Sequence, residues 1–231
     1  MRTSRELIRS LQERIQLLPS APPREWVTSG CGGLDRMLPS EGFCRGTLVE
    51  WLGAAGGGAT TFAMIAAREA SRNGRVVVVV DRARRFYPPA ATACGIALEN
   101  LVVVRPTSQP DFDWTMNQAL RSPAAAAVMC WPEALESRSL RRWQLAAEAG
   151  GSLGLLVRPT SAANQSSWAD LRLLVQARPT AGPPRFQVEL LRSRHGQSGR
   201  SVELELDDET STLHLVPELA APAPLRRAAE T

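Results

Sequence analysis

A glycine-rich segment near the start of the chain carries the residue types that bind phosphate. Residues 47–52 (TLVEWL) form an apolar run typical of a strand, residues 53–58 (GAAGGG) are dense in glycine, and an apolar helical pattern follows from Thr60 to Ala70. In such an arrangement the backbone N–H groups of the loop point at an anion, and the helix N-terminus adds its positive dipole end. The candidate nucleotide loop comprises Gly53, Gly56, Gly57, Gly58, Ala59, Thr60 and Thr61.

The glycine-rich segment lacks the lysine charge of a phosphate-binding loop. The phosphate-loop pattern G-x-x-x-x-G-K-[S/T] is met with Ala59 at the lysine position. All 27 basic residues of the chain are arginine. A drift from lysine to arginine would have placed arginine at this position, so alanine indicates a change in chemistry.

Length and composition favour one globular domain with appended segments. The chain has 231 residues, 44% of them hydrophobic, and a net charge of only +4. Its four cysteines have no paired spacing and lie far from both histidines, so we expect reduced thiols and no metal site. There is no signal-peptide pattern, and no apolar run approaches the roughly 20 residues of a membrane span. We expect a soluble cytoplasmic protein without membrane contact.

The first and last segments of the chain differ from its middle. Leu7, Leu11 and Ile15 recur at helical spacing between residues 4 and 18, and the proline-rich stretch that follows ends this helix. The apolar stripe either packs on its own domain or docks on a partner. We expect residues 1–24 to form a helix and linker, residues 25–219 a core domain, and the proline-rich residues 220–231 a disordered tail.

Strands alternate with helices through the middle of the chain. The predicted strands are residues 47–52, 75–81, 101–104, 125–130 and 153–157, and the predicted helices are 60–70, 89–94, 111–121 and 137–149. This alternation predicts a mainly parallel α/β sheet flanked by helices. From residue 170 only strands follow, over residues 171–176, 185–191, 201–206 and 213–216, which predicts an antiparallel extension at one sheet edge.

Several segments together resemble a known family. The phrase TSGCGGLDRMLPSEGFCRGTLVEWLG is similar to the opening of the RecA-type recombinase core. With residues 139–159 and 202–220, the order of segments resembles the ImuA family, RecA-like accessory proteins of bacterial translesion synthesis. The resemblance runs from about residue 26 to residue 220 and implies a RecA-like phosphate-loop fold.

The resemblance also identifies three replaced catalytic groups. The family's phosphate-loop lysine falls on Ala59, its water-activating glutamate on Ala83, and its magnesium-supporting aspartate on about Cys130. Phosphoryl transfer depends on positioning and on cancelling charge at the transferring group. We therefore expect no ATP hydrolysis and no required cofactor. Weak ATP or phosphate binding stays open, because loop N–H groups and a helix dipole persist.

Arginines and one tryptophan are candidates for contact with nucleic acid or a partner. The resemblance places Arg192 and Arg194 where two basic residues reach a neighbouring subunit's nucleotide, and Trp168 in the position of a DNA-binding loop. The remaining candidates are Arg82, Arg84, Arg85, Arg141 and Arg142. The alternatives are solvated arginines and a tryptophan that packs on its own domain.

The resemblance implies an accessory protein of the SOS-type DNA-damage response that binds a Y-family-like polymerase subunit. Further expected partners are RecA or its DNA filament, and single-stranded DNA bound weakly and without sequence preference. Two other functions remain open. One is a weak or partner-completed ATPase that acts as a recombination mediator, and the other is a cell-division inhibitor of the SulA type.

Overall fold

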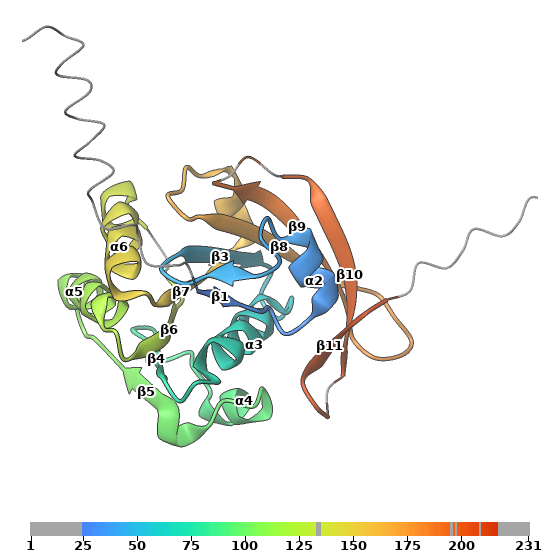
Figure 1. Cartoon of the computed structure of the whole chain (residues 1–231), viewed down its shortest axis with the longest axis horizontal. Helices are drawn as coiled ribbons and strands as arrows, with labels where there is room; N and C mark the ends of the chain where they lie inside the picture. Colours follow the sequence, from blue (N-terminus) through green and yellow to red (C-terminus); the bar gives the residue numbers. More distant parts are fainter. Residues whose placement is uncertain (1–24, 133–134, 195, 197, 208, 217–231) are drawn as a thin grey trace, which may run out of the picture.

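The computed structural model describes residues 25–216 except 133–134, 195, 197 and 208 (Figure 1). The predicted N-terminal helix with Leu7, Leu11 and Ile15, and the predicted tail over residues 220–231, lie outside the described residues. The predicted alternation of strands and helices is present from β3 (Leu48–Gly53) to β7 (Leu153–Pro159).

A nine-stranded sheet, counted within the described residues, forms the centre of the fold, in the order β11-β10-β9-β8-β3-β7-β6-β4-β5. Its parallel part consists of β3 (Leu48–Gly53), β4 (Val76–Val80), β5 (Leu101–Val104), β6 (Ala125–Cys130), β7 (Leu153–Pro159) and β8 (Leu171–Arg178). The five valines of β4 lie between β5 and β6 with helices on both faces. A run with no polar alternation suits such a strand.

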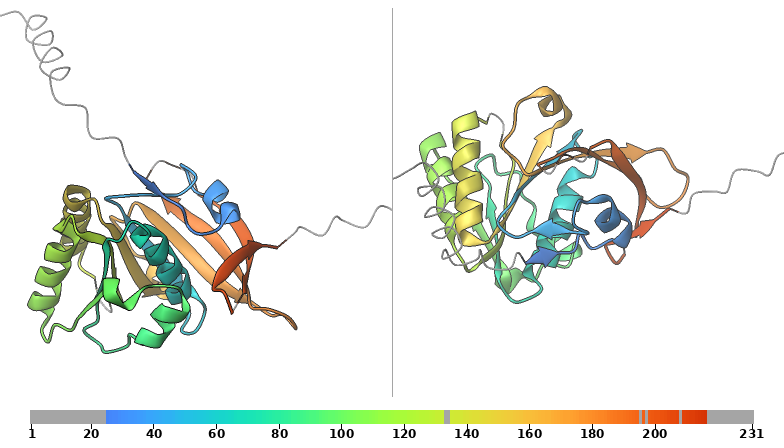
Figure 2. Two further views of the ribbon diagram at one scale, coloured as in Figure 1. Left: turned by 60° about the horizontal axis from the view of Figure 1, so that its bottom comes forward. Right: turned by 45° about the horizontal axis from the view of Figure 1, so that its top comes forward.

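Helices cover both faces of the parallel strands. They are α3 (Ala59–Ser71), α4 (Pro88–Ala93), α5 (Gln109–Arg121) and α6 (Ser137–Gly150). Alternate residues of β4 show the division, since Val77 and Val79 share a cluster with α3 while Val80 packs with α5 and α6. Figure 2 shows α5 and α6 side by side on one face. The predicted α/β fold with helices on both faces of a mainly parallel sheet is confirmed.

The C-terminal strands confirm the predicted antiparallel extension with one correction. Strands β9 (Arg185–Ser193), β10 (Arg200–Asp207) and β11 (Thr212–Leu215) pair antiparallel in succession. However, β8, which was grouped with them, pairs parallel to β3. The connection through the short helix η2 (Thr160–Asn164) carries the chain back to the amino end of the sheet before β8 begins.

The entry segment contains three short elements that are not among the predicted strands and helices. These are β1 (Trp26–Val27), α2 (Gly32–Met37) and β2 (Phe43–Cys44), with β1 and β2 paired antiparallel. Asp35 fixes the start of α2 by accepting hydrogen bonds from the Thr28 hydroxyl and the Ser29 N–H. In Figure 2 the curved strands β10 and β11 wrap around α2.

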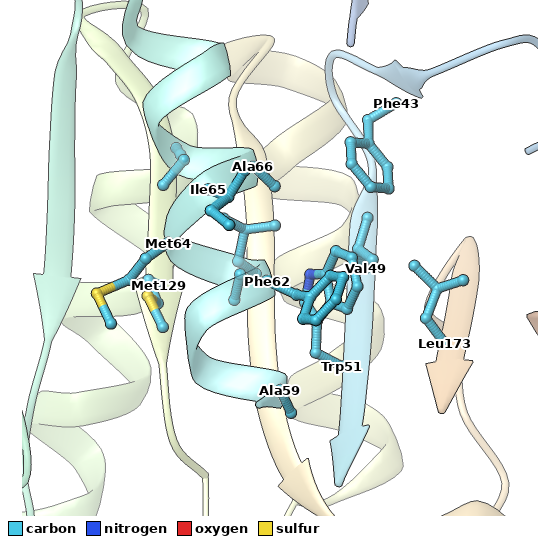
Figure 3. Packing of buried hydrophobic residues seen from close by; sticks show 14 of the residues in the cluster. Phe43, Val49, Trp51, Ala59, Phe62, Met64, Ile65, Ala66, Met129 and Leu173 are labelled. Atoms are coloured by element: carbon cyan, nitrogen blue, oxygen red, sulfur yellow. The ribbon is translucent and has the colours of Figure 1, made fainter. Parts of the chain in front are cut away.

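An aromatic row links this entry segment to α3. The ring centroids of Phe43 and Trp51 lie 5.8 Å apart, those of Trp51 and Phe62 5.9 Å, and those of Phe62 and Phe186 5.4 Å. Figure 3 shows Trp51 and Phe62 packed between β3 and α3, with Ala59 at the start of the helix. Because aromatic rings bury large areas, this row fixes α3, and with it the glycine loop, against the sheet.

Candidate functional site: the glycine loop

The backbone of the glycine loop keeps the form of an anion site. β3 ends at Gly53, and α3 begins after Gly58, which has φ of +92°. The first hydrogen bond of the helix runs from the Phe62 N–H to the Gly58 carbonyl (3.0 Å). The N–H groups of the three preceding residues, 59–61, therefore point out of the helix N-terminus. Within the loop, the Gly57 N–H donates to the Ala54 carbonyl (2.9 Å).

An aromatic ring from another strand holds the loop in this form. A Cβ atom added to Gly58 would lie 2.5 Å from Cε1 of Phe186 in β9. The ring therefore packs directly on the loop, and the left-handed backbone at Gly58 is enclosed on this side. Ala59 is buried and lies against Gly53, where an added Cβ would be 2.9 Å from the Ala59 methyl group. No charged group stands at residue 59.

The hydroxyl that could hold Mg²⁺ is bonded to an indole. The Trp131 Nε1–H donates to Oγ1 of Thr60 (3.2 Å), and the Trp131 ring lies 6.2 Å from that of Phe86. Cys130, at the position expected for the magnesium-supporting aspartate, ends β6 and is fully buried. Burial raises the pKa of the Cys130 thiol, which keeps it neutral. Mg²⁺ prefers oxygen ligands, so a neutral thiol and an indole N–H do not fit a Mg²⁺–nucleotide complex.

The carboxylate at the end of β4 stabilises a turn. Asp81 is buried, and its two oxygens accept from the backbone N–H groups of Arg85 (2.8 Å) and Phe86 (3.1 Å). Arg105 forms an ion pair with it at 3.7 Å. Ala83, at the position of the expected catalytic base, is exposed within that turn.

The predicted arginine candidates fall at two ends of the molecule. Arg82, Arg84 and Arg85 are exposed in the turn after β4, and Arg82 donates to Gln109 (2.7 Å). By contrast, Arg192 and Arg194 lie where β9 pairs with the beginning of β8, at the opposite end from the glycine loop.

Those two arginines and Trp168 contact groups of their own domain. Arg192 donates to the Ser167 carbonyl (2.6 Å), and Arg194 forms an ion pair with Asp170 at 3.0 Å. Trp168 is 46% exposed. Its Nε1–H donates to Ser137 (2.8 Å), and the Arg141 guanidinium lies 4.9 Å from the centre of its ring. Arg142 is exposed on α6.

A cavity of about 790 Å³ lies at the amino ends of the parallel strands. It brings together the predicted candidates Arg141 and Arg194 with two arginines that the sequence reading missed, Arg45 and Arg75. The glycine-loop residues do not line it. Arg45 and Arg75 lie in turns before strands and carry no sequence pattern that would have linked them.

A buried ion-pair network lies in the middle of the sheet, between the glycine loop and the cavity. Glu50, in the middle of β3, pairs with Arg158 of β7 (3.1 Å) and Arg172 of β8 (2.7 Å), and it accepts from Ser167 (2.9 Å). Arg172 also donates to the carbonyls of residues 162, 163 and 165. It thereby fixes the loop between β7 and β8. The signal in the sequence was a glutamate inside an apolar strand, since a buried charge needs a partner.

The chain was compared with known proteins. Residues 19–128, a little under half of the chain, match the model of the RecA N-terminal domain. RecA of Rhodopirellula baltica is 32% identical over 103 residues, which cover 45% of this chain and 28% of that protein. RecA of Bartonella bacilliformis is 38% identical over 96 residues, covering 42% and 26%. The aligned stretch thus spans less than a third of these relatives.

The fold has a solved counterpart. The crystal structure of the RadB recombinase superposes with a TM-score of 0.66 and 16% sequence identity, covering 83% of this chain and all of the other. The chain therefore has a RecA/RadB recombinase-like fold, and its residues 19–128 are similar to the RecA N-terminal domain.

Two features are absent from the described residues. None of the helices placed by the structure is long and apolar enough to cross a membrane. Within the same residues, no group of three or more histidine, cysteine, aspartate or glutamate side chains could hold a metal ion.

Proposed function

We propose that this protein is a non-hydrolysing RecA-like accessory protein of the DNA-damage response. In this proposal it acts in mutagenic translesion synthesis by binding a Y-family-like polymerase subunit. The observation that carries the proposal is the Trp131 indole N–H bonded to the hydroxyl of Thr60, next to Ala59. The resemblance adds that Ala59, Ala83 and Cys130 fall at the positions of three catalytic groups. The resemblance of the chain's segments to the ImuA family supports the cellular role.

Loss of hydrolysis is expected from the energetics of the site. Phosphoryl transfer needs positive charge on the transferring group and a positioned base. Backbone N–H groups at the start of α3 supply neither a full charge nor a base. The same loop geometry supports a second candidate function, a partner-completed ATPase, because residues 53–61 retain the backbone form of a phosphate site.

ATP turnover by the purified chain tests the first function against the second. We expect no turnover above a heat-denatured control, with or without single-stranded DNA. Turnover that appears on adding the polymerase subunit or RecA, and is lost on Gly56→Asp, would favour the partner-completed ATPase. Gly56 suits this control because its left-handed backbone (φ +72°) faces open space, with nothing within 4 Å of an added Cβ.

Partner binding requires a separate measurement. The full chain should retain a Y-family-like polymerase subunit in a pull-down assay, and cells that lack the protein should lose damage-induced mutation. Deleting residues 1–20 should abolish the pull-down and leave the thermal transition nearly unchanged if the stripe at Leu7, Leu11 and Ile15 docks on the partner. Normal damage-induced mutation without the protein would contradict the proposed role.

A further inference from the structure

The cavity at the amino ends of the strands has an unusual distribution of charge. Its wall contains four arginines, which are Arg45, Arg75, Arg141 and Arg194. It contains one carboxylate fewer, namely Glu25, Glu148 and Asp170. Arg194 is paired with Asp170 (3.0 Å). The charges of Arg45 and Arg75, on the turns before β3 and β4, are less fully neutralised by carboxylates.

Arg45 and Arg75 both line the cavity, and the charge of Arg75 acts on Arg45. The Arg45 side chain is only 11% exposed, and its carboxylate partner Glu25 is 72% exposed (3.0 Å). Burial and then the charge of Arg75 lower the pKa of Arg45. An exposed carboxylate offsets little of this like-charge repulsion, because water screens it.

Some hydrogen-bond donors of Arg45 and Arg75 have no acceptor among the described residues. Arg45 donates through Nη2 to the Ala70 carbonyl (2.8 Å) at the end of α3, and Arg75 donates through Nη2 to the Ala125 carbonyl (2.9 Å). These bonds hold the Arg45 side chain at the end of α3 and the Arg75 side chain at the start of β6. Yet Nη1 of Arg45 and Nε of Arg75 are buried without a hydrogen-bond partner. Such donors are costly unless an acceptor reaches them.

We propose that this cavity is a binding site for a phosphate-bearing ligand, with the phosphate group held by Arg45 and Arg75. Guanidinium groups match phosphate oxygens in geometry and charge. A cavity of about 790 Å³ is of the size that accepts a nucleotide-sized molecule. Trp26, which is 48% exposed at the wall, offers a ring on which a base can stack. The site is separate from the glycine loop and does not depend on the proposed function.

The test uses the full chain with sodium pyrophosphate at constant ionic strength, measured by calorimetry and by thermal shift. We expect saturable binding and a raised melting temperature. Arg75→Gln and Arg45→Gln should each weaken binding about tenfold or more, as expected for loss of a charge-assisted hydrogen bond. Arg200→Gln, at an exposed arginine outside the cavity, should leave the affinity unchanged.

Two further variants keep the result clear if an arginine variant folds poorly. Glu25→Gln removes the exposed carboxylate beside Arg45 and should tighten binding about two- to fivefold. Gly56→Asp places a negative charge in the glycine loop and should have no effect. Binding that Gly56→Asp removes and Arg75→Gln spares would overturn the proposal, as would the absence of binding at millimolar pyrophosphate.

The source of the phosphate is distinguished by ADP. Tighter binding of ADP than of pyrophosphate, with the gain lost in Trp26→Ala, assigns the site to a nucleotide. Equal affinities that Trp26→Ala does not change assign it to the phosphate group alone. Binding of single-stranded DNA without any binding of pyrophosphate or ADP would contradict the proposed site.

Discussion

The carboxyl and amino ends of the parallel strands differ in the groups that could bind a phosphate. At the carboxyl end, the glycine loop keeps backbone N–H groups at the start of α3 but has alanine at residue 59 and an indole on Thr60. At the amino end, four arginines line a cavity, and no phosphate-loop pattern marks them. The two ends are separated by the length of β3, about 16 Å at 3.3 Å per residue.

The shape of the glycine loop and its chemistry depend on different interactions. Phe186 packs on Gly58 through apolar contact, so the loop keeps its form whether or not a phosphate binds. The charges that would act on a phosphate depend on single side chains, and residue 59 is alanine. Under the proposed function, the glycine loop is therefore a structural turn that does not depend on catalytic groups.

The largest expected effect concerns the network between the two ends. Glu50→Gln removes the carboxylate that balances Arg158 and Arg172 and leaves both cations buried. Breaking a buried ion pair in this way lowers the free energy of unfolding by about 3–5 kcal/mol. Urea unfolding measures the loss. The matched control is Glu205→Gln, whose pair with Arg185 is partly exposed and should contribute less than about 1 kcal/mol. Equal effects of the two variants would contradict the role of burial.

The next effect separates loop shape from loop chemistry. Gly58→Ala places a methyl group against Phe186 and strains a left-handed residue, so the free energy of unfolding should fall by about 2–5 kcal/mol. Gly56→Ala carries the same backbone strain in open space and should cost about 1–2 kcal/mol. Phe186→Leu should recover part of the difference in a double-mutant cycle. Equal losses for the two glycines would show that the ring does not hold the loop.

Much of this fold follows from the sequence alone. Strong patterns, such as the valines of β4 and the alternation in β9, give strand positions to within a residue or two because burial on one or both faces dictates them. The short helix α2 was missed, since its six residues make no full apolar period. The parallel pairing of β8 was also missed, because strand direction depends on where the preceding loop returns.

The site could be predicted only in part for a related reason. The loss of charge at Ala59 is written in a motif of fixed spacing, so the sequence predicts it. The contacts of Trp131 with Thr60 and of Phe186 with Gly58 join residues 71 and 128 positions apart, and no local pattern encodes them. The same holds for Arg45 and Arg75 in the cavity.

A smaller effect tests the role of Thr60. Thr60→Val removes the acceptor of the Trp131 indole N–H, and an unpaired donor there should lower the free energy of unfolding by about 1–2 kcal/mol. Thr61→Val, one residue on and not part of this contact, should change the free energy of unfolding by less than about 0.5 kcal/mol. Thermal unfolding with and without Mg²⁺–ADP provides the second measurement. If Mg²⁺–ADP stabilises the unaltered chain and not Thr60→Val, the hydroxyl is a metal ligand after all.

The smallest expected effect follows from placing a lysine at residue 59. Ala59→Lys should strengthen nucleotide binding about tenfold. The lysine ammonium would donate one charge-assisted hydrogen bond to the phosphate, beside the bonds from the N–H groups at the start of α3. It should not produce ATP turnover, since Ala83 still supplies no base, Cys130 still supplies a neutral thiol, and Trp131 still bonds Thr60. Calorimetry with ADP and a turnover assay measure the two results, and Ala59→Met, similar in length and uncharged, controls for bulk at a buried position. Turnover by Ala59→Lys alone would show that a single charge separates this loop from a working ATPase.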